Sequence, residues 1–297
     1  MSVRDLLDPI FYFGARTCEK SPAIAQLVRR FDFKGKGSIV QRIRPEAMSR
    51  EVTVVCDGIL FCLDLRDDVQ RELYFNRYER VDVREALSVV SVGGVCLDVG
   101  ANNGAFALQL AKKVGEKGTV HAFEADPDIF SRLVQNTSLN RFESQLHCHN
   151  IALTNANGPI KFYRSDRIHS GWGSLEKFGD IAVGMQQVEG HTLDYFIEKE
   201  GITHVDLLKI DVEAHEPELL EGARNSLAKR LFRFVLIEFN GIRLAERQKT
   251  LNDFLQPLSS AGYRPTKFRL DLLKKMQQGL ISPASVCTNF LFEAKPN

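Results

Sequence analysis

The chain has 297 residues, of which 44% are hydrophobic and 26% are charged, a composition typical of a globular protein. This composition excludes a disordered chain, a collagen and a coiled coil. Because 39 Lys and Arg residues balance 38 Asp and Glu residues, the formal net charge is +1, and we expect no strongly basic surface for nucleic acid.

The cysteines and the N-terminal residues predict the cellular compartment of the protein. The six cysteines are scattered without a C-x-x-C pair, and most lie in apolar runs. This pattern predicts reduced, buried thiols in a cytoplasmic protein. Asp5, Asp8 and Pro9 interrupt the first apolar residues, and no apolar run approaches the roughly 18 residues that a membrane span needs. We therefore expect no signal peptide and no membrane partner.

The first 80 residues are predicted to precede the main sheet. Residues 1–50 have an irregular, helix-like pattern, which predicts a helical cap or accessory segment. Two β-rich runs within 53–65 flank Asp57-Gly58, a dipeptide that favours a tight hairpin turn. A helix is expected to follow within 51–80. Solvated basic side chains, rather than a nucleic-acid surface, are expected at Arg29, Arg30, Lys34, Lys36, Arg42 and Arg44.

Beyond residue 80 strands and helices alternate, which predicts an α/β fold with a parallel sheet covered on both faces. We expect residues 51–297 to form one domain with its core sheet within 93–295. The predicted strands are 95–99, 119–123, 145–153, 205–210, 234–239, 263–269 and 288–293. The predicted helices are 105–114, 127–140, 217–227 and 244–258.

A polar segment interrupts this alternation. After a β excursion at 160–164, residues 164–187 contain Gly171, Trp172 and Gly173, which predicts a mobile lid loop. His169 in this segment is the base that a lid would deliver to a substrate, and an exposed histidine without a catalytic role is the alternative.

A glycine turn after the first core strand predicts a cofactor site. Gly100 and Gly104 let the backbone approach a ligand and leave helix amides free to meet a carboxylate. Glu124 ends the next strand, where it can accept hydrogen bonds from two ribose hydroxyls. Ligands of open parallel sheets bind at this carboxyl edge. A plain strand-to-helix connection is the alternative, and Glu124 argues against it.

The same turn distinguishes between two cofactors. A dinucleotide site requires G-x-G-x-x-G, but Asn102 and Ala105 stand where glycine is needed. Asp98 at the strand end repels phosphates and suits an ammonium group. Both features favour S-adenosyl-L-methionine over NAD, and an NAD-linked oxidoreductase remains a rival.

A second charged run follows the strand at 205–210. With the period-two alternation of a strand, Lys209, Asp211 and Glu213 share one face. Burying such groups is costly unless they pair, so they form either a salt-bridge network or a substrate site. We assign catalytic roles to Asp211, Glu213, Lys209, His215 and His169, with Asp211 or Glu213 accepting a proton directly or through His215.

Three segments together resemble the FkbM family of S-adenosylmethionine-dependent methyltransferases: DVGANNG at 98–104, FEADP at 123–127 and KIDVEAHE at 209–216. Supporting matches lie at 150–153, 192–194 and 236–238. The resemblance implies a Rossmann-like class I sheet of seven strands with the last strand antiparallel. It also implies methyl transfer, usually to oxygen of a small molecule or sugar. The family usually has Pro at the position of Ala125 and Gly at that of Ala214, where alanine leaves less room.

These motifs define the predicted site residues. Cofactor binding is assigned to Asp98, Gly100, Ala101, Asn102, Asn103, Gly104, Glu124, Ala125, Asn150, Ile151, Ala152 and Asp211. Substrate binding is assigned to Trp172, Ser174, Glu238, Asn240 and Tyr78. We expect a small-molecule acceptor, whereas the sequence does not define the oligomeric state.

Metal binding has two candidate sets. Asp211, Glu238 and Asn240 end neighbouring strands and offer three oxygen ligands suited to magnesium, a set that resembles the metal site of catechol-type methyltransferases. Because Lys209 can neutralise Asp211 without an ion, we favour a site without metal. The motif His147-x-His149 has no evident third ligand and is expected to be structural.

The predicted function is therefore O-methylation of a small molecule, at a hydroxyl or carboxyl group of a natural product or sugar. One alternative is N-methylation of a peptide or small molecule. Another is a cofactor-binding scaffold without turnover, which a methylation assay distinguishes from an enzyme.

Overall fold

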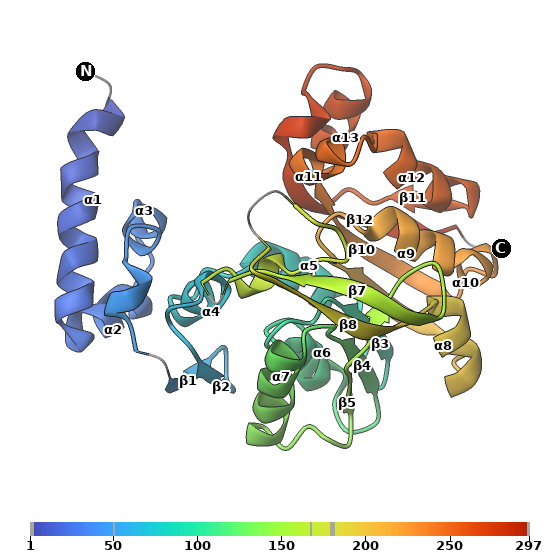
Figure 1. The fold of residues 1–297 in the computed structure, drawn as a ribbon, viewed down its shortest axis with the longest axis horizontal. Coiled ribbons are helices and arrows are strands. Elements are labelled where there is room, and N and C mark those ends of the chain that lie inside the picture. Colours follow the sequence, from blue (N-terminus) through green and yellow to red (C-terminus); the bar gives the residue numbers. More distant parts are fainter. Residues whose placement is uncertain (1–2, 50, 167, 179–181, 296–297) are drawn as a thin grey trace. The chain divides into compact units, whose positions relative to one another are not determined.

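The computed structural model describes residues 3–49, 51–166, 168–178 and 182–295 (Figure 1). Its internal contacts divide the chain into two compact units. The first unit is Met1–Arg80 with Asp166–Gly171, and the second is Val81–Ser165 with Trp172–Asn297. The division of the sequence into a cap at 1–50 and a domain at 51–297 stays a prediction.

The first unit contains helices and one hairpin. Its elements are α1 (Val3–Lys20), α2 (Pro22–Arg30), α3 (Lys36–Val40), the 3-10 helix η1 (Pro45–Ala47), β1 (Val52–Cys56), β2 (Ile59–Leu63) and α4 (Asp68–Tyr74). The predicted hairpin is confirmed, because β1 and β2 pair in antiparallel fashion. At its turn Asp57 has φ 49° and Gly58 has φ 74°, the left-handed pair that a two-residue turn requires.

One basic side chain of this unit is buried rather than solvated, which corrects the expectation for Lys36. Lys36 is only 2% exposed, and its Nζ lies 3.2 Å from Asp32 and 3.1 Å from the Arg29 carbonyl oxygen. Arg44 pairs with Glu19 at 2.9 Å but is exposed, as expected.

The second unit is built on a seven-stranded sheet with the order β11-β12-β10-β9-β3-β4-β5. The strands are β3 (Val95–Val99), β4 (Thr119–Phe123), β5 (Leu146–His149), β9 (Val205–Ile210), β10 (Phe232–Asn240), β11 (Tyr263–Pro265) and β12 (Cys287–Ala294). β12 is antiparallel to both of its neighbours, whereas the other pairs are parallel. The predicted Rossmann-like sheet with an antiparallel last strand is confirmed.

Helices cover both faces of this sheet (Figure 1). They are α5 (Arg80–Val89), α6 (Ala107–Val114), α7 (Pro127–Leu139), α8 (Leu193–Glu200), α9 (Glu216–Gly222), α10 (Arg224–Ala228), α11 (Gly241–Glu246), α12 (Leu251–Ser260) and α13 (Leu270–Gln277). An extended apolar core joins Leu208 and Ile210 of β9 to Phe196 of α8 and Leu219 of α9. Helix α6 packs on the other side, against β3, β4 and β5.

A second, three-stranded sheet corrects two predictions. It has the order β6-β8-β7, with β6 (Ala152–Leu153), β7 (Gly158–Arg164) and β8 (Gly184–His191). The strand predicted at 145–153 is wrong, since it is divided between β5 and β6 in different sheets. The loop predicted at 164–187 is shorter than expected, because its last four residues belong to β8 and Arg164 belongs to β7, and its role as a mobile lid stays a prediction. Residues 167 and 179–181 of that segment lie outside the described residues.

Two predicted helices are each divided in the structure. The helix at 217–227 is α9 followed by α10, and the helix at 244–258 is α11 followed by α12. The second break occurs where Gln248 has φ 56° and Thr250 begins a new helix. Thr250 and Asp253 form a capping box, which satisfies the first amides of α12. Helices α5, α8 and α13 were not predicted.

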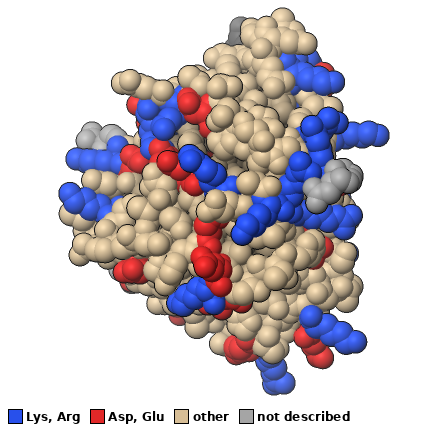
Figure 2. All heavy atoms as spheres, turned by 90° about the vertical axis from the view of Figure 1, so that its right-hand side faces the viewer, with Lys and Arg blue, Asp and Glu red and all other residues tan. Residues whose placement is uncertain are grey.

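Three further predictions concern membrane-spanning helices, surface charge and the cysteine thiols. Among the helices of the described ranges, none is both long and apolar enough to cross a membrane. The face in Figure 2 carries basic and acidic side chains interspersed, in keeping with the small net charge. All six cysteines are free thiols; four are buried, whereas Cys287 is exposed.

Candidate active site

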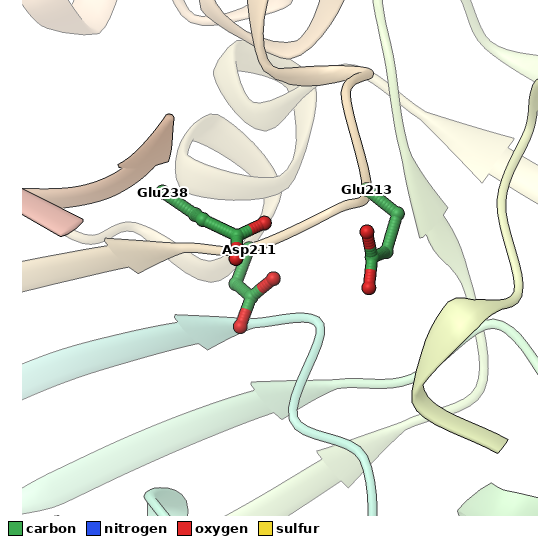
Figure 3. A group of neighbouring side chains, drawn as sticks. All are labelled: Asp211, Glu213 and Glu238. Atoms are coloured by element: carbon green, nitrogen blue, oxygen red, sulfur yellow. The ribbon is translucent and has the colours of Figure 1, made fainter. Parts of the chain in front are cut away.

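Acidic side chains gather where β3, β4, β9 and β10 end. The register explains this gathering, because Lys209 of β9 pairs with Asp98 of β3 and with Leu236 of β10. Two residues further along, Asp211 and Glu238 therefore lie side by side. Figure 3 shows their carboxylates together, with Glu213 pointing toward them from the loop after β9. Ligand oxygens of these three side chains lie within 4.8 Å of one another.

The glycine turn after β3 contacts this loop. Gly100 has φ 78°, and a Cβ atom there would lie 1.8 Å from the Asp211 carbonyl oxygen. The Asp211 amide also donates a hydrogen bond to the Val99 carbonyl oxygen at 3.0 Å. Only glycine fits this crossing, so the turn assigned to the cofactor and the loop assigned to catalysis are built as one piece.

Glu124 fastens the same turn from the other side. Its Oε2 accepts a hydrogen bond from the Asn102 amide at 2.9 Å, and its Oε1 accepts one from the Asp126 amide at 2.8 Å. The Asn150 side chain donates to the Glu124 carbonyl oxygen at 2.8 Å and to that of Ala125 at 3.2 Å. Burial raises the pKa of Glu124 to about 7. The remaining lone pairs of its carboxylate suit hydroxyl donors such as those of a ribose.

We expect Glu124→Ala to weaken S-adenosylmethionine binding at least about tenfold, since a hydrogen bond to a charged group contributes about 1.5–3 kcal/mol. The ionised carboxylate is the better acceptor, so wild-type affinity should rise as pH increases through about 7. Calorimetry at pH 6 and pH 8 measures both effects.

The control for this prediction is Glu124→Gln, which keeps the shape of the side chain but does not titrate. Its affinity should change less with pH than that of the wild type, because position 124 no longer titrates. Some change should remain, since other carboxyl groups of the site titrate in both proteins. Equal affinity of wild type and Glu124→Ala would contradict the ribose assignment.

Lys209 is the hub of the cluster. Its Nζ lies 3.4 Å from Asp98 Oδ1 and 3.2 Å from Asp211 Oδ2, and it donates a hydrogen bond to the Gly100 carbonyl oxygen at 3.2 Å. Asp98 is 0% exposed and Lys209 is 1% exposed. Burial raises the pKa of Asp98, whereas Lys209 opposes that shift. Lys209 is thus a positioning residue by its contacts, and its predicted catalytic role stays a prediction.

The loop carrying Glu213 is held in an uncommon conformation. Glu213 has φ 54° and Ala214 has φ 69°, values in the left-handed region that favours glycine. Glu216, which is fully buried, accepts hydrogen bonds from the Val212 amide at 3.1 Å and the Ala214 amide at 3.3 Å. The alanine at 214 therefore fits, with its backbone braced by a carboxylate inside the loop.

Arg243 is a site residue that the sequence reasoning missed. Its Nη1 donates a hydrogen bond to Glu213 Oε2 at 2.8 Å, and the Asn240 side chain donates to the same oxygen at 3.4 Å. The guanidinium lies 5.4 Å from the ring centre of Trp172 and 4.8 Å from that of Phe178. Burial raises the pKa of Glu213 to about 8, although Arg243 acts in the opposite direction.

The segment that begins at Trp172, where the chain returns to the second unit, also contacts Glu213. The Ser174 hydroxyl donates a hydrogen bond to the Glu213 carbonyl oxygen at 3.0 Å. The Ser174 amide donates to the Tyr163 carbonyl oxygen at 3.0 Å, and the Tyr163 amide donates to the Ser174 carbonyl oxygen at 2.8 Å. The structure thus brings Trp172, Ser174 and Asn240 of the predicted substrate set to one place. Their contact with a substrate stays a prediction.

His215 belongs to a different network. Its Nε2 shares a hydrogen bond with Thr154 Oγ1 at 2.9 Å, and its Nδ1 lies 3.3 Å from Glu176 Oε1. Arg247 pairs with Glu176 and with Glu218, each at 2.8 Å. Among the described residues, His215 shares no hydrogen bond with the carboxylates of Figure 3. The structure therefore gives no direct path for the predicted proton relay.

Two further predicted site residues belong to the first unit, and a predicted histidine pair belongs to the second. His169 and Tyr78 belong to the first unit, where His169 Nδ1 lies 2.9 Å from Asp166 Oδ1. Their catalytic and substrate roles stay predictions. On the second unit, His149 Nε2 lies 3.1 Å from Nδ1 of His121, so the expected structural pair involves His121 rather than His147. Burial lowers the pKa of His121 and of His149 to about 4, which keeps both rings neutral.

The strand order, the antiparallel β12 and the acids at the strand ends define a class I S-adenosylmethionine-dependent methyltransferase. The chain belongs to the FkbM methyltransferase family, because the family model of the methyltransferase FkbM domain matches residues 98–265. The predicted resemblance is thereby confirmed.

Individual relatives share less than a third of their aligned residues with this chain. The hexuronic acid methyltransferase AglP of Haloferax volcanii is 29% identical over 164 residues, which cover 55% of this chain and 63% of that protein, less than two thirds of its length. The 2-O-methyltransferase NoeI of Sinorhizobium fredii is 25% identical over 185 residues, covering 56% of this chain and 71% of NoeI. A solved O-methyltransferase structure from Bacillus cereus has 14% identity and a TM-score of 0.40, covering 73% of this chain and 81% of that one.

Proposed function

We propose that this methyltransferase acts on a hydroxyl oxygen of a small molecule and that sugars are its acceptor class. The observation that carries the proposal is the group of three carboxylates, Asp211, Glu213 and Glu238, beside the turn assigned to the cofactor (Figure 3). Carboxylates bind the hydroxyls of a polyol and accept a hydroxyl proton. The names of AglP and NoeI, a hexuronic acid methyltransferase and a 2-O-methyltransferase, support a sugar-like acceptor.

When bound, S-adenosylmethionine supplies an electrophilic methyl group on a sulfonium. We assign its ribose to Glu124 and its amino-acid part to the turn at 100–104. The residues present fit the cofactor, because Glu124 keeps acceptor capacity beyond its two amide partners. The buried Asp98 also keeps acceptor capacity, because Nζ of Lys209 lies 3.4 Å from its Oδ1 and its Oδ2 has no hydrogen-bond partner among the described residues. Ala125, Asn150, Ile151 and Ala152 are proposed to flank the cofactor.

The proposal is tested by methyl transfer. The purified protein is incubated with S-adenosylmethionine labelled in its methyl group and with methyl glucoside, glucuronic acid or an amino sugar. We expect a methyl ether on a saccharide hydroxyl, detected by mass spectrometry and NMR. Methylation of nitrogen alone would overturn the oxygen assignment. Cofactor binding with no transfer to any acceptor would favour the scaffold alternative.

We propose that the reaction needs no magnesium. The three carboxylates are close enough for a divalent ion, but Lys209 already neutralises Asp211 and Arg243 already neutralises Glu213. The third carboxylate of this group is Glu213 rather than the predicted Asn240. The Asn240 side chain donates a hydrogen bond to Glu213 Oε2. We also propose a cytoplasmic location, which the free thiols support.

We expect an excess of chelator to leave the turnover rate unchanged, because protein cations fill the place of an ion. The measurement compares turnover after EDTA treatment with turnover after magnesium is added back. Loss of activity with EDTA and recovery with magnesium would overturn the proposal that the reaction needs no magnesium.

A further inference from the structure

The carboxylates beside β9 and β10 differ in their partners. Asp211 Oδ2 lies 3.2 Å from Nζ of Lys209, and Glu213 Oε2 accepts a hydrogen bond from Arg243 at 2.8 Å. One oxygen of each of these carboxylates is thus paired with a cation, and the remaining lone pairs of Asp211 and Glu213 suit the hydroxyls of an acceptor.

Glu238 lacks such a cation among the described residues. Its Oε1 lies 3.5 Å from Cys287 Sγ, a weak donor, and its Oε2 has no hydrogen-bond partner there. Glu238 is partly exposed as a residue, whereas Oε2 itself is buried, so an acceptor hydroxyl has to enter beside this carboxylate to reach it. In Figure 3 the Glu238 carboxylate lies beside that of Asp211, and its side chain extends in the direction of Glu213.

The surroundings of Glu238 increase its affinity for a proton. Burial raises its pKa well above the ordinary value, and the negative charges of Asp211, Glu213 and Glu216 add to this shift. Cys287 faces it from β12 and acts in the same direction. In its ionised form, a carboxyl group with a raised pKa is a stronger base. A nearby positive charge, such as the sulfonium that the cofactor would supply, would favour that ionised form.

We infer that Glu238 accepts the proton of the acceptor hydroxyl during methyl transfer, an inference that rests on the proposed function. The hydroxyl oxygen forms a bond to the methyl carbon, the carbon–sulfur bond breaks with its electron pair on sulfur, and the hydroxyl proton moves to the Glu238 carboxylate. The sulfonium and the carboxylate thus neutralise each other, giving a methyl ether, a thioether and a carboxylic acid. The carboxyl proton then leaves to solvent.

The test uses whichever of methyl glucoside or glucuronic acid the wild-type protein methylates. We expect Glu238→Gln to lower kcat by about 10²–10⁴, the usual contribution of general base catalysis, while the Kd for S-adenosylmethionine is unchanged. The increase of kcat with pH in the wild type should be weaker in this variant. Added formate should restore part of the turnover of Glu238→Ala, because it supplies the missing carboxylate.

The control is Glu293→Gln, which changes an exposed glutamate of β12 and should leave kcat unchanged. Glu213 and Glu216 titrate in every variant, so the pH profile of Glu238→Gln is compared with that of the control. A kcat for Glu238→Gln within about tenfold of wild type, with the same pH profile, would overturn the inference alone. Absence of oxygen methylation by the wild type would instead overturn the proposed function.

Discussion

We expect the substitution Lys209→Ala to lower the free energy of unfolding by about 3–5 kcal/mol, the usual effect of removing one partner from a buried ion pair. The variant leaves Asp98, which is 0% exposed, without its cation. It also removes the hydrogen bond that holds the Gly100 carbonyl oxygen. Urea unfolding followed by circular dichroism measures the loss of stability.

The matched control is Lys275→Ala. Lys275 pairs with Asp271 at 2.7 Å on an exposed face of α13, where both side chains are largely solvated. An exposed pair contributes about 0–1 kcal/mol, so this variant should be nearly as stable as the wild type. Equal stabilities of the two variants would show that Lys209 does not carry a buried charge network.

The second large effect is expected for Gly100→Ala. Its Cβ atom would lie 1.8 Å from the Asp211 carbonyl oxygen, and its φ of 78° is unfavourable for alanine. We expect the free energy of unfolding to fall by about 2–5 kcal/mol, from overpacking and from the left-handed conformation together. Cofactor affinity should also fall, because the turn and the loop after β9 must separate. Urea unfolding and calorimetry measure these changes.

Gly201→Ala provides the control, because Gly201 is in the left-handed region with φ 63° and has no atom within 4 Å of an added Cβ. This variant should show only the conformational cost of about 1–2 kcal/mol and normal cofactor affinity. If Gly100→Ala were no worse than Gly201→Ala, the close contact between the turn and the loop would be refuted.

The central part of the fold could be predicted because its strands are short, continuous apolar runs. Residues 95–99, 119–123 and 205–210 match β3, β4 and β9 residue for residue. The pairing of β7 with β8 could not be predicted in this way, because the two strands are polar and 19 residues separate them. The break between α11 and α12 did have a signal, the capping box of Thr250 and Asp253.

The candidate site shows a similar division. The acids at positions 98, 124, 211 and 238 were identified because strand ends meet at one edge of a parallel sheet. Their cations were assigned less well, since side-chain pairing depends on distances that sequence spacing does not give. Lys209 was predicted to neutralise Asp211 and to act in catalysis; its contacts with two carboxylates and a carbonyl oxygen confirm the pairing, and its catalytic role stays a prediction. Arg243 was missed, although its place on the helix after β10 puts it near the same edge.

The division of the chain also affects the order in which the protein can fold during synthesis. The first unit takes residues 166–171 from the middle of the sequence, so the chain passes between the units three times. Because synthesis proceeds from the N-terminus, residues 81–165 must emerge from the ribosome before the first unit has all of its parts. A truncation after residue 80 would therefore yield an incomplete first unit, whereas the full chain supplies both pieces in the same molecule.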